Sequence, residues 1–290
     1  MRHIVSGKTR ICGLIGDPVE HSMSPAMQNA AFRELGLDYI YVPFRVKSTE
    51  LGQAIAGMRA LNIRGLNVTV PHKVAVVQFL DKLDPLAEKI GAVNTIVNDD
   101  GVLTGYNTDA TGFLQALLER EIEPAGKRAV ILGAGGAARA IAFILAERGA
   151  TLLILNRALE LDWAEELAQR LSATFNKKVK ALELNRENLM PALDKADILV
   201  NATSVGMSPK ADETPLPAGL LRPGLIVYDI VYNPVKTRLL REAEAVGAST
   251  ISGVDMLVWQ GALAFEKWTG RKAPVELMKR ETVRLLKRQI

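Results

Sequence analysis

Short apolar segments alternate with amphipathic segments along almost the whole chain. The apolar segments have the length of buried strands and lie at residues 10–15, 39–46, 65–70, 92–97, 128–132, 151–155, 197–201 and 225–230. Between them, stretches such as PAMQNAAFREL carry apolar residues at the three- and four-residue spacing of an amphipathic helix. This alternation predicts βαβ units, and therefore an α/β protein whose parallel sheets carry helices on both faces.

A change of pattern at residues 106–126 predicts a domain boundary. There YNTDATGFLQALLER is typical of a helix that enters a new region, and from residue 127 the chain restarts as strand, glycine-rich turn and helix. Two further helices follow residue 252 and are expected to return to the first domain. We therefore expect two α/β lobes separated by a cleft, one built from 1–109 plus 253–290 and the other from 110–252.

The composition is that of a soluble globular protein, with 48% hydrophobic and 23% charged residues. No run of about 18 apolar residues is present, so no membrane-spanning helix is expected. The first residues lack the apolar core of a signal peptide. Cys12 is the only cysteine, which excludes an intrachain disulfide and suits a reducing compartment. We therefore expect a cytoplasmic protein with no membrane partner.

The charge pattern does not favour a nucleic-acid partner. The net charge is +4 and only 5% of residues are aromatic, so few side chains can stack on bases. One basic cluster lies in a helix-like segment near the C-terminus, and we expect it to be a solvated helix face. It consists of Lys279, Arg280, Arg284, Lys287 and Arg288.

A glycine-rich turn follows the apolar strand at residues 128–132. Gly133, Ala134 and Gly135 form the turn, and the next residues, GAARAIAFILAERG, have helical spacing. The pattern is G-x-G-x-x-A, in which glycine allows close approach of the backbone to a pyrophosphate and the helix N-terminus offers free N–H groups. Because strand, turn, helix and the following strand are in register, the segment predicts dinucleotide binding.

The end of the next strand indicates which dinucleotide. An NAD enzyme usually presents a carboxylate there to hold the ribose 2′-hydroxyl, whereas this chain presents Asn156 and Arg157, with no carboxylate before Glu160. A guanidinium matches a 2′-phosphate in charge and in hydrogen-bond geometry. NADP is therefore the expected cofactor. NAD is the alternative, because Arg157 can also be interpreted as an ordinary surface charge.

Candidate chemistry in the first half centres on the segment GLNVTVPHK, residues 65–73. Lys73 is expected in the first turn of a helix, where the helix dipole disfavours a cation. It also follows the carboxyl end of a strand, where α/β sheets bind ligands. The position therefore suggests a functional lysine, with the neighbouring His72 expected to face the other way.

Ser22 and Ser24 precede a predicted helix that has Pro25 at its first position and Gly36 at its end. Ser24 as the N-cap is a sufficient structural explanation for that residue. Ser22 is not needed for capping, and two hydroxyls beside free helix N–H groups suit a carboxylate ligand.

Two further polar residues stand next to predicted elements. Asn94 lies in the segment AVNTIV, and Asp109 precedes another helix, of which it is alternatively only the N-cap. No metal site is expected, because no two histidines have ligand spacing and there is a single cysteine.

Taken together, the motifs resemble those of the shikimate dehydrogenase family. SMSP, GLNVTVPHK, GAVNTI, GYNTDATGF, GAGGAARA, NATSVGM, DIVYNP and GVDMLVWQG occur in the family's order and near its spacing, over nearly the whole chain. The resemblance implies a substrate-binding and catalytic domain at 1–109 plus 253–290 and a Rossmann NADP-binding domain at 110–252. It also implies an oxidoreductase that reduces 3-dehydroshikimate to shikimate with NADPH, a step in chorismate and aromatic amino-acid biosynthesis.

The resemblance assigns roles by position. Lys73 and Asp109 correspond to the catalytic pair. Residues implied to bind the substrate are Ser22, Ser24 and Thr69 for its carboxylate, with Tyr232 nearby, and Asn67, Asn94 and Gln260 for its ring hydroxyls. Residues implied to bind the cofactor are Gly133, Ala134, Gly135, Gly136 and Ala137 at the pyrophosphate, Asn156 and Arg157 at the adenosine end, and Thr203, Ser204, Val205, Met207, Val231 and Gly253 at the nicotinamide.

The sequence departs from the family after Arg157. The family's loop commonly continues with Thr and a nearby basic residue, whereas this chain reads NRALELDWAEEL and presents carboxylates in a longer loop. The departure keeps an NAD-preferring quinate/shikimate dehydrogenase as an alternative. From another class, a non-catalytic nucleotide-binding sensor is the second alternative, although it would be expected to lack Lys73 or Asp109. The expected assembly is a monomer or a homodimer.

Overall fold

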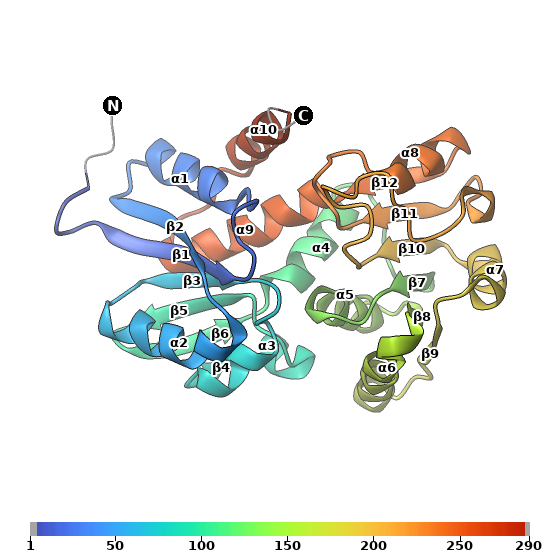
Figure 1. Cartoon of the computed structure of the whole chain (residues 1–290), viewed down its shortest axis with the longest axis horizontal. Helices are drawn as coiled ribbons and strands as arrows, with labels where there is room; N and C mark the ends of the chain where they lie inside the picture. The colour runs from blue at the N-terminus through green and yellow to red at the C-terminus, as the bar shows by residue number, and fades with distance from the viewer. Residues whose placement is uncertain (1–4, 288–290) are drawn as a thin grey trace. The chain divides into compact units, whose positions relative to one another are not determined.

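The computed structural model describes residues 5–287, and the chain divides into two compact α/β units (Figure 1). The first unit consists of Met1–Asp109 and Val258–Ile290, and the second of Ala110–Leu257. The predicted α/β class with two units is therefore confirmed. Residues 253–257, which the sequence assigns to the first unit, belong to the second by their contacts.

The described part of the first unit contains a six-stranded sheet in the order β2-β1-β3-β5-β6-β4. Its strands are β1 Arg10–Gly16, β2 Tyr39–Arg45, β3 Gly65–Val68, β4 Lys82–Leu83, β5 Thr95–Asp99 and β6 Val102–Tyr106. Strand β5 runs antiparallel to both β3 and β6, so the prediction of a purely parallel sheet is wrong here. The cause is a hairpin: Asp100 and Gly101 adopt φ of 51° and 90°, the left-handed conformations of a tight Asp-Gly turn.

Helices cover both faces of this sheet, with α1 and α10 on one side and α2 and α3 on the other (Figure 1). The helices are α1 Ser24–Glu34, α2 Leu51–Ala60, α3 Pro85–Ile90, α9 Gly253–Thr269 and α10 Val275–Leu286, with short 3₁₀ turns η1 Ser48–Glu50 and η2 Ala75–Phe79. Helix α10 packs on α1, so the C-terminal segment returns to the first unit as expected. Arg288 of the predicted basic face lies outside the described residues.

The second unit contains a six-stranded sheet in the order β12-β11-β10-β7-β8-β9, and every neighbouring pair is parallel. Its strands are β7 Arg128–Leu132, β8 Thr151–Asn156, β9 Lys180–Glu183, β10 Ile198–Asn201, β11 Ile226–Asp229 and β12 Ser249–Ser252. Numbered from β7, the order is that of a doubly wound dinucleotide-binding sheet, whose ligands bind beyond the carboxyl ends of the strands.

Helices also flank this second sheet. They are α4 Thr108–Leu118, α5 Gly136–Glu147, α6 Leu161–Phe175, α7 Arg186–Lys195 and α8 Arg238–Ala245, with 3₁₀ turns η3 Ala158–Glu160 and η4 Ala218–Leu220. Helices α5 and α6 contact each other and β8, whereas Leu193 of α7 and Leu239 of α8 share a hydrophobic core with Val130 and Leu199 of the strands.

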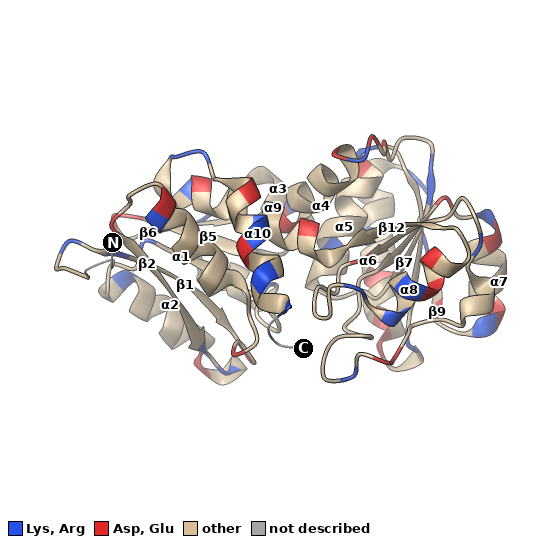
Figure 2. Cartoon of the chain, turned by 90° about the horizontal axis from the view of Figure 1, so that it is seen from above, with Lys and Arg blue, Asp and Glu red and all other residues tan. Residues whose placement is uncertain are grey.

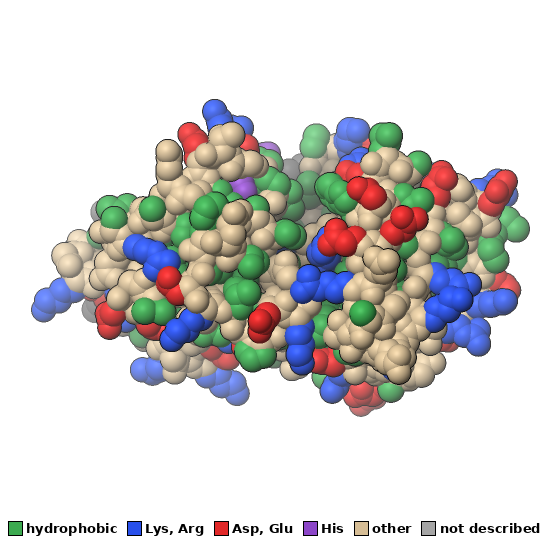
Figure 3. Space-filling model, turned by 90° about the horizontal axis from the view of Figure 1, so that it is seen from below, with side chains coloured by type: hydrophobic (Ala, Val, Ile, Leu, Met, Phe, Trp, Pro, Cys, Tyr) green, Lys and Arg blue, Asp and Glu red, His purple; other side chains and the backbone are tan. Residues whose placement is uncertain are grey.

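The surface carries charges of both signs. Lys, Arg, Asp and Glu alternate along exposed helices such as α7 and α8 (Figure 2), and the face drawn in Figure 3 shows acidic, basic and hydrophobic side chains interspersed. Among residues 5–287, no helix combines the length and hydrophobicity required to cross a bilayer.

Candidate active site

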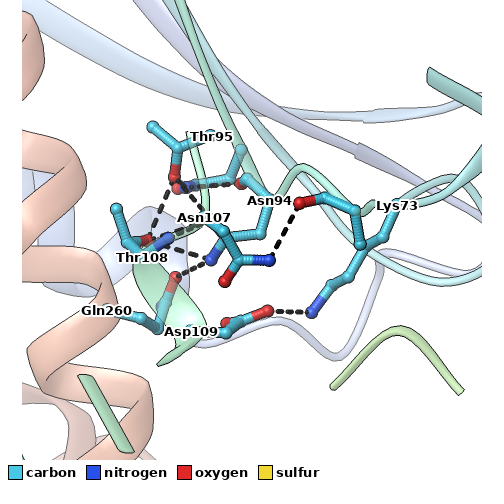
Figure 4. Close-up of polar contacts among 9 residues, drawn as sticks. Lys73, Asn94, Thr95, Asn107, Thr108, Asp109 and Gln260 are labelled. Carbon is cyan, nitrogen blue, oxygen red and sulfur yellow. Dashed lines mark hydrogen bonds and ion pairs between the residues drawn. The ribbon is translucent and has the colours of Figure 1, made fainter. Parts of the chain in front are cut away.

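Lys73 and Asp109 form the central contact of the first unit. The Lys73 Nζ donates to the Asp109 Oδ2 at 2.6 Å, and their side chains are only 15% and 6% exposed (Figure 4). Asp109 is the second residue of α4, where the positive end of the helix dipole favours a carboxylate. An ion pair with so little solvent contact holds the ammonium in one place, as a proton donor to a ligand must be held.

The turn that carries Lys73 differs from the sequence prediction. Lys73 lies outside any helix, because the expected helix is only the 3₁₀ turn η2, which begins two residues later. Hydrogen bonds fix this turn: the Val93 N–H donates to the Lys73 carbonyl at 2.8 Å, and the His72 Nε2 donates to the Val46 carbonyl at 2.7 Å. His72 is buried, so it anchors the turn through its own side chain while the Lys73 side chain reaches Asp109.

Next to the ion pair lies a buried network of amides and hydroxyls around Asn94 (Figure 4). The Asn94 Oδ1 accepts from the Thr108 N–H at 2.7 Å, and its Nδ2 donates to the Thr108 Oγ1 at 2.9 Å and toward the Gln260 Oε1 at 3.5 Å. Thr95 bridges to Asn67, whose Nδ2 donates to the Thr95 Oγ1 at 3.1 Å. The network fixes the N-terminus of α4, and with it Asp109.

Tyr41 extends this network across the sheet. Its hydroxyl donates to the Asn67 Oδ1 at 2.8 Å, and burial raises the pKa of this phenol well above its ordinary value. Tyr41, Thr95 and Thr108 are site residues that the sequence did not single out. Thr108 had a signal, because it stands between Asn107 and Asp109 in the quoted motif GYNTDATGF.

Ser22 and Ser24, which were predicted to bind a carboxylate, differ from the prediction in which of them caps helix α1. Ser24 is the first residue of α1 and is not an N-cap, since Met23 takes that position without a side-chain cap. The Ser22 Oγ instead accepts from the Ser24 N–H at 3.2 Å. Ser22 is therefore the residue that satisfies a helix N–H group. Thr69 follows β3, and its N–H donates to the Ile15 carbonyl at 2.9 Å, which ties it to the end of β1.

In the second unit, the glycine turn has the geometry expected of a pyrophosphate cradle. Gly133 has a φ of 101°, which favours glycine, and α5 begins at Gly136 with Gly135 as its N-cap. A Cβ added at Gly135 would meet no atom within 4 Å, so the space above the helix N-terminus is open. Ala134 is buried and Ala137 is half-buried. These residues fit a dinucleotide phosphate.

Two loops predicted to border the nicotinamide are tied together by a buried pair, Asn201 and Asp229. The Asn201 Nδ2 donates to the Asp229 Oδ1 at 2.9 Å, and the Asn201 Oδ1 accepts from the Thr203 hydroxyl at 2.7 Å. Asp229 also accepts from the Val231 N–H at 3.1 Å and from the Thr237 hydroxyl at 2.6 Å. Each of these polar residues ends an apolar strand, which is the sequence signal that distinguishes them.

Burial has a marked effect on this carboxyl group. Asp229 is fully buried, and the loss of solvation raises its pKa from the ordinary 3.8 to about 6, although its three hydrogen-bond donors oppose the rise. The three donors hold the Asp229 side chain in place, and the group thereby organises the two loops.

The remaining predicted cofactor residues have mixed surroundings. Ser204 and Met207 are exposed and Val205 is half-buried in the loop after β10, and the predicted substrate residue Tyr232 is half-buried in the loop after β11. Gly253 has a packing reason of its own, because an added Cβ would lie 2.2 Å from the Ile230 carbonyl oxygen.

At the predicted adenosine end, Asn156 and Arg157 contact one acidic residue. The Asn156 Nδ2 donates to the Glu160 carbonyl at 2.6 Å, and the Arg157 guanidinium is paired with the Glu160 carboxylate. Arg157 is 69% exposed and therefore accessible to a ligand.

Among the described residues, no group of three or more His, Cys, Asp and Glu side chains is arranged to hold a metal ion. Cys12 is buried within β1, and burial raises the pKa of its thiol far above the ordinary value. This thiol is therefore a packing group, as a lone cysteine in an apolar strand usually is.

A dinucleotide-type sheet with its glycine turn, together with a separate unit that holds a lysine–aspartate pair, is the organisation of a nicotinamide-dependent dehydrogenase. Three family models match the chain: the shikimate dehydrogenase substrate-binding domain over residues 14–96, shikimate/quinate 5-dehydrogenase over 116–208, and the shikimate 5′-dehydrogenase C-terminal domain over 253–281. The chain belongs to the shikimate dehydrogenase family.

Individual relatives match over nearly their full length. A shikimate dehydrogenase (NADP⁺) of Dehalococcoides mccartyi is 53% identical over 269 residues, which is 93% of each chain. A crystal structure of a shikimate dehydrogenase in complex with NADP⁺ superposes with a TM-score of 0.92 at 45% identity and covers 98% of each chain. The Listeria monocytogenes enzyme, in complex with shikimate and NAD, has a TM-score of 0.88 at 46% identity, covering 95% of this chain and 97% of that one.

Proposed function

We propose that the protein catalyses the reversible, NADPH-dependent reduction of 3-dehydroshikimate to shikimate. The observation that carries this proposal is the shielded contact between Lys73 and Asp109, 2.6 Å long, in a chain 53% identical to a shikimate dehydrogenase (NADP⁺). The names of the relatives favour this function over an NAD-preferring quinate/shikimate dehydrogenase, and the presence of both residues speaks against a non-catalytic sensor.

In the proposed reaction, the glycine turn at Gly133 and Gly135 would hold NADPH, which would supply the hydride that reduces the ketone carbon of the substrate. As negative charge develops on the ketone oxygen, the Lys73 ammonium stabilises it and transfers a proton to it, which yields the alcohol. Asp109 holds the ammonium and accepts a hydrogen bond from a substrate hydroxyl. Lys73 then regains a proton from solvent.

The remaining assignments are part of the same proposal. Residues 1–109 plus 253–290 bind the substrate, whose carboxylate is held by Ser22, Ser24 and Thr69 and whose hydroxyls are held by Asn67, Asn94 and Gln260. Tyr232 is the one substrate residue assigned from outside these ranges. Asn67 and Asn94 already hydrogen-bond to protein groups, so a substrate would contact them beside these partners or in their place. Residues 110–252 bind NADP. The proposal includes a cytoplasmic, monomeric or homodimeric enzyme.

The test is an assay of reduced nicotinamide by absorbance, with shikimate or quinate crossed against NADP⁺ or NAD⁺. We expect the highest kcat/KM with shikimate and NADP⁺. Activity confined to quinate and NAD⁺ would establish the alternative dehydrogenase, and cofactor binding without turnover would establish the sensor.

Lys73→Ala tests the mechanism itself. Removal of a general acid typically lowers the rate about 10²–10⁴-fold, so we expect kcat to fall in this range. NADP⁺ affinity, measured by calorimetric titration, should stay nearly unchanged because Lys73 is assigned to the substrate. Turnover close to wild type would remove Lys73 from the mechanism.

A further inference from the structure

The 3₁₀ turn η3 folds Glu160 back onto Arg157. The Glu160 N–H donates to the Arg157 carbonyl at 3.0 Å, and the Asn156 Nδ2 donates to the Glu160 carbonyl at 2.6 Å. Asn156 is itself buried. The backbone of Glu160 is therefore fixed from two sides, and its side chain starts from a defined position next to the guanidinium.

The Glu160 carboxylate engages the guanidinium through two hydrogen bonds. The Arg157 Nε donates to Oε2 at 2.8 Å, and the Nη2 donates to Oε1. This is the bidentate geometry that a guanidinium uses for carboxylates and phosphates alike. Each partner also shifts the other: the Glu160 hydrogen bond raises the pKa of Arg157, and the Arg157 hydrogen bond lowers the pKa of Glu160. Both groups are thus charged at neutral pH.

We propose that Glu160 is a specificity-determining residue that competes with the 2′-phosphate of NADP for the Arg157 guanidinium and so narrows the preference for NADP over NAD. The inference rests on the proposed function, in which Arg157 binds the adenosine end. A 2′-phosphate must displace the carboxylate or share the guanidinium with it, and both are anions. NAD has a 2′-hydroxyl in place of the phosphate, so its binding does not require this exchange.

The effect should be moderate in size. Arg157 is 69% exposed, and exposed ion pairs are weak, so a ligand displaces this carboxylate at small cost. We expect Glu160→Gln, which keeps the shape and removes the charge, to tighten binding of adenosine 2′,5′-bisphosphate on the order of fivefold. Binding of adenosine 5′-monophosphate should stay the same. The gain should shrink at high salt because the pair is exposed to solvent.

The experiment is a calorimetric titration of the full chain with these two nucleotides, at low and high salt. Asp162→Asn is the matched control, since it removes an exposed carboxylate two residues away that makes no hydrogen bond to Arg157 in the described structure. In an Arg157→Ala background, Glu160→Gln should have no effect, which completes a double-mutant cycle. Steady-state kinetics should show a lower KM for NADP⁺ in Glu160→Gln and an unchanged KM for NAD⁺.

The inference is overturned if Glu160→Gln leaves bisphosphate affinity unchanged or weakens it. It is equally overturned if both nucleotides gain alike, if Asp162→Asn gives the same gain, or if the gain persists without Arg157. These outcomes are distinct from failure of the proposed function. A wild-type protein that binds the bisphosphate but does not oxidise shikimate would refute the function and still allow the Glu160 test.

Discussion

Asp229 makes the stability of the second unit depend on pH in a direction opposite to that of most carboxylates. The group is fully buried, and burial raises its pKa from 3.8 to about 6. Because the folded-state pKa lies above the unfolded value, the stabilisation from this group is fully present below about pH 4. It is lost as the pH rises through about 6, when the buried carboxyl must ionise.

The size of this effect follows from the two pKa values. A difference from 3.8 to about 6 corresponds to about 3 kcal/mol between the two ends of the titration. Asparagine at this position stays neutral at every pH. Its Oδ1 can still accept from the Asn201 side chain and the Val231 N–H, whereas the Thr237 hydroxyl loses its present acceptor. That loss shifts the stability of the variant by a constant amount and leaves its pH dependence untouched.

We therefore predict that the unfolding free energy of Asp229→Asn, relative to wild type, rises by about 2.5 kcal/mol between pH 4 and pH 8. Urea unfolding followed by circular dichroism at a series of pH values measures this difference. Asp194→Asn, the same substitution at an exposed site in α7, is the control. A flat difference for Asp229→Asn would show that this carboxyl ionises equally easily in the folded and unfolded chains.

Two further predictions concern packing. Gly65→Ala places a Cβ 2.0 Å from the Nε1 of the buried Trp268 and should lower the unfolding free energy by about 3 kcal/mol. The control is Gly57→Ala in α2, where the added Cβ meets no atom within 4 Å. This control should raise the unfolding free energy by about 0.5–1 kcal/mol. Equal urea midpoints for the two variants would contradict the predicted clash. Tyr228→Phe removes a buried hydroxyl that has no hydrogen-bond partner in the described structure and should raise thermal stability by about 1 kcal/mol; a loss of stability would show that the hydroxyl is satisfied.

The sequence predicted those parts of the fold that have strong local signals. The turn at Gly133 and the helix that starts at Gly136 are as expected, because strand, turn and helix each had their own residue pattern. Strands β4, β6, β9 and β12 were missed. Strands β9 and β12 are the edge strands of their sheet, pair on one side only, and read KALE and STIS without an apolar run. A continuous apolar run marks a strand that is buried on both faces, and these two edge strands lack that signal.

Side-chain partners were harder to predict than positions. The contact between Lys73 and Asp109 joins residues 36 apart in sequence, and only the resemblance to a family suggested that they act together. Asn201 and Asp229 stood in quoted motifs, yet nothing local indicates that they bond each other across neighbouring strands.

In the loop after Arg157, too, the sequence identified the residues but not the contacts that they make. The sequence identified Glu160 as the first carboxylate after Asn156 and Arg157, and read the segment as a weakened phosphate site. The structure adds that the turn closes within three residues and that Glu160 is the partner of both predicted ligand-binding residues. The backbone carbonyl of Glu160 accepts from Asn156, and its side-chain carboxylate accepts from Arg157. The type of a residue determines its charge, whereas the local fold of its turn determines which group that charge contacts. Cofactor preference in this family member should therefore depend on the geometry of η3 as much as on the presence of Arg157.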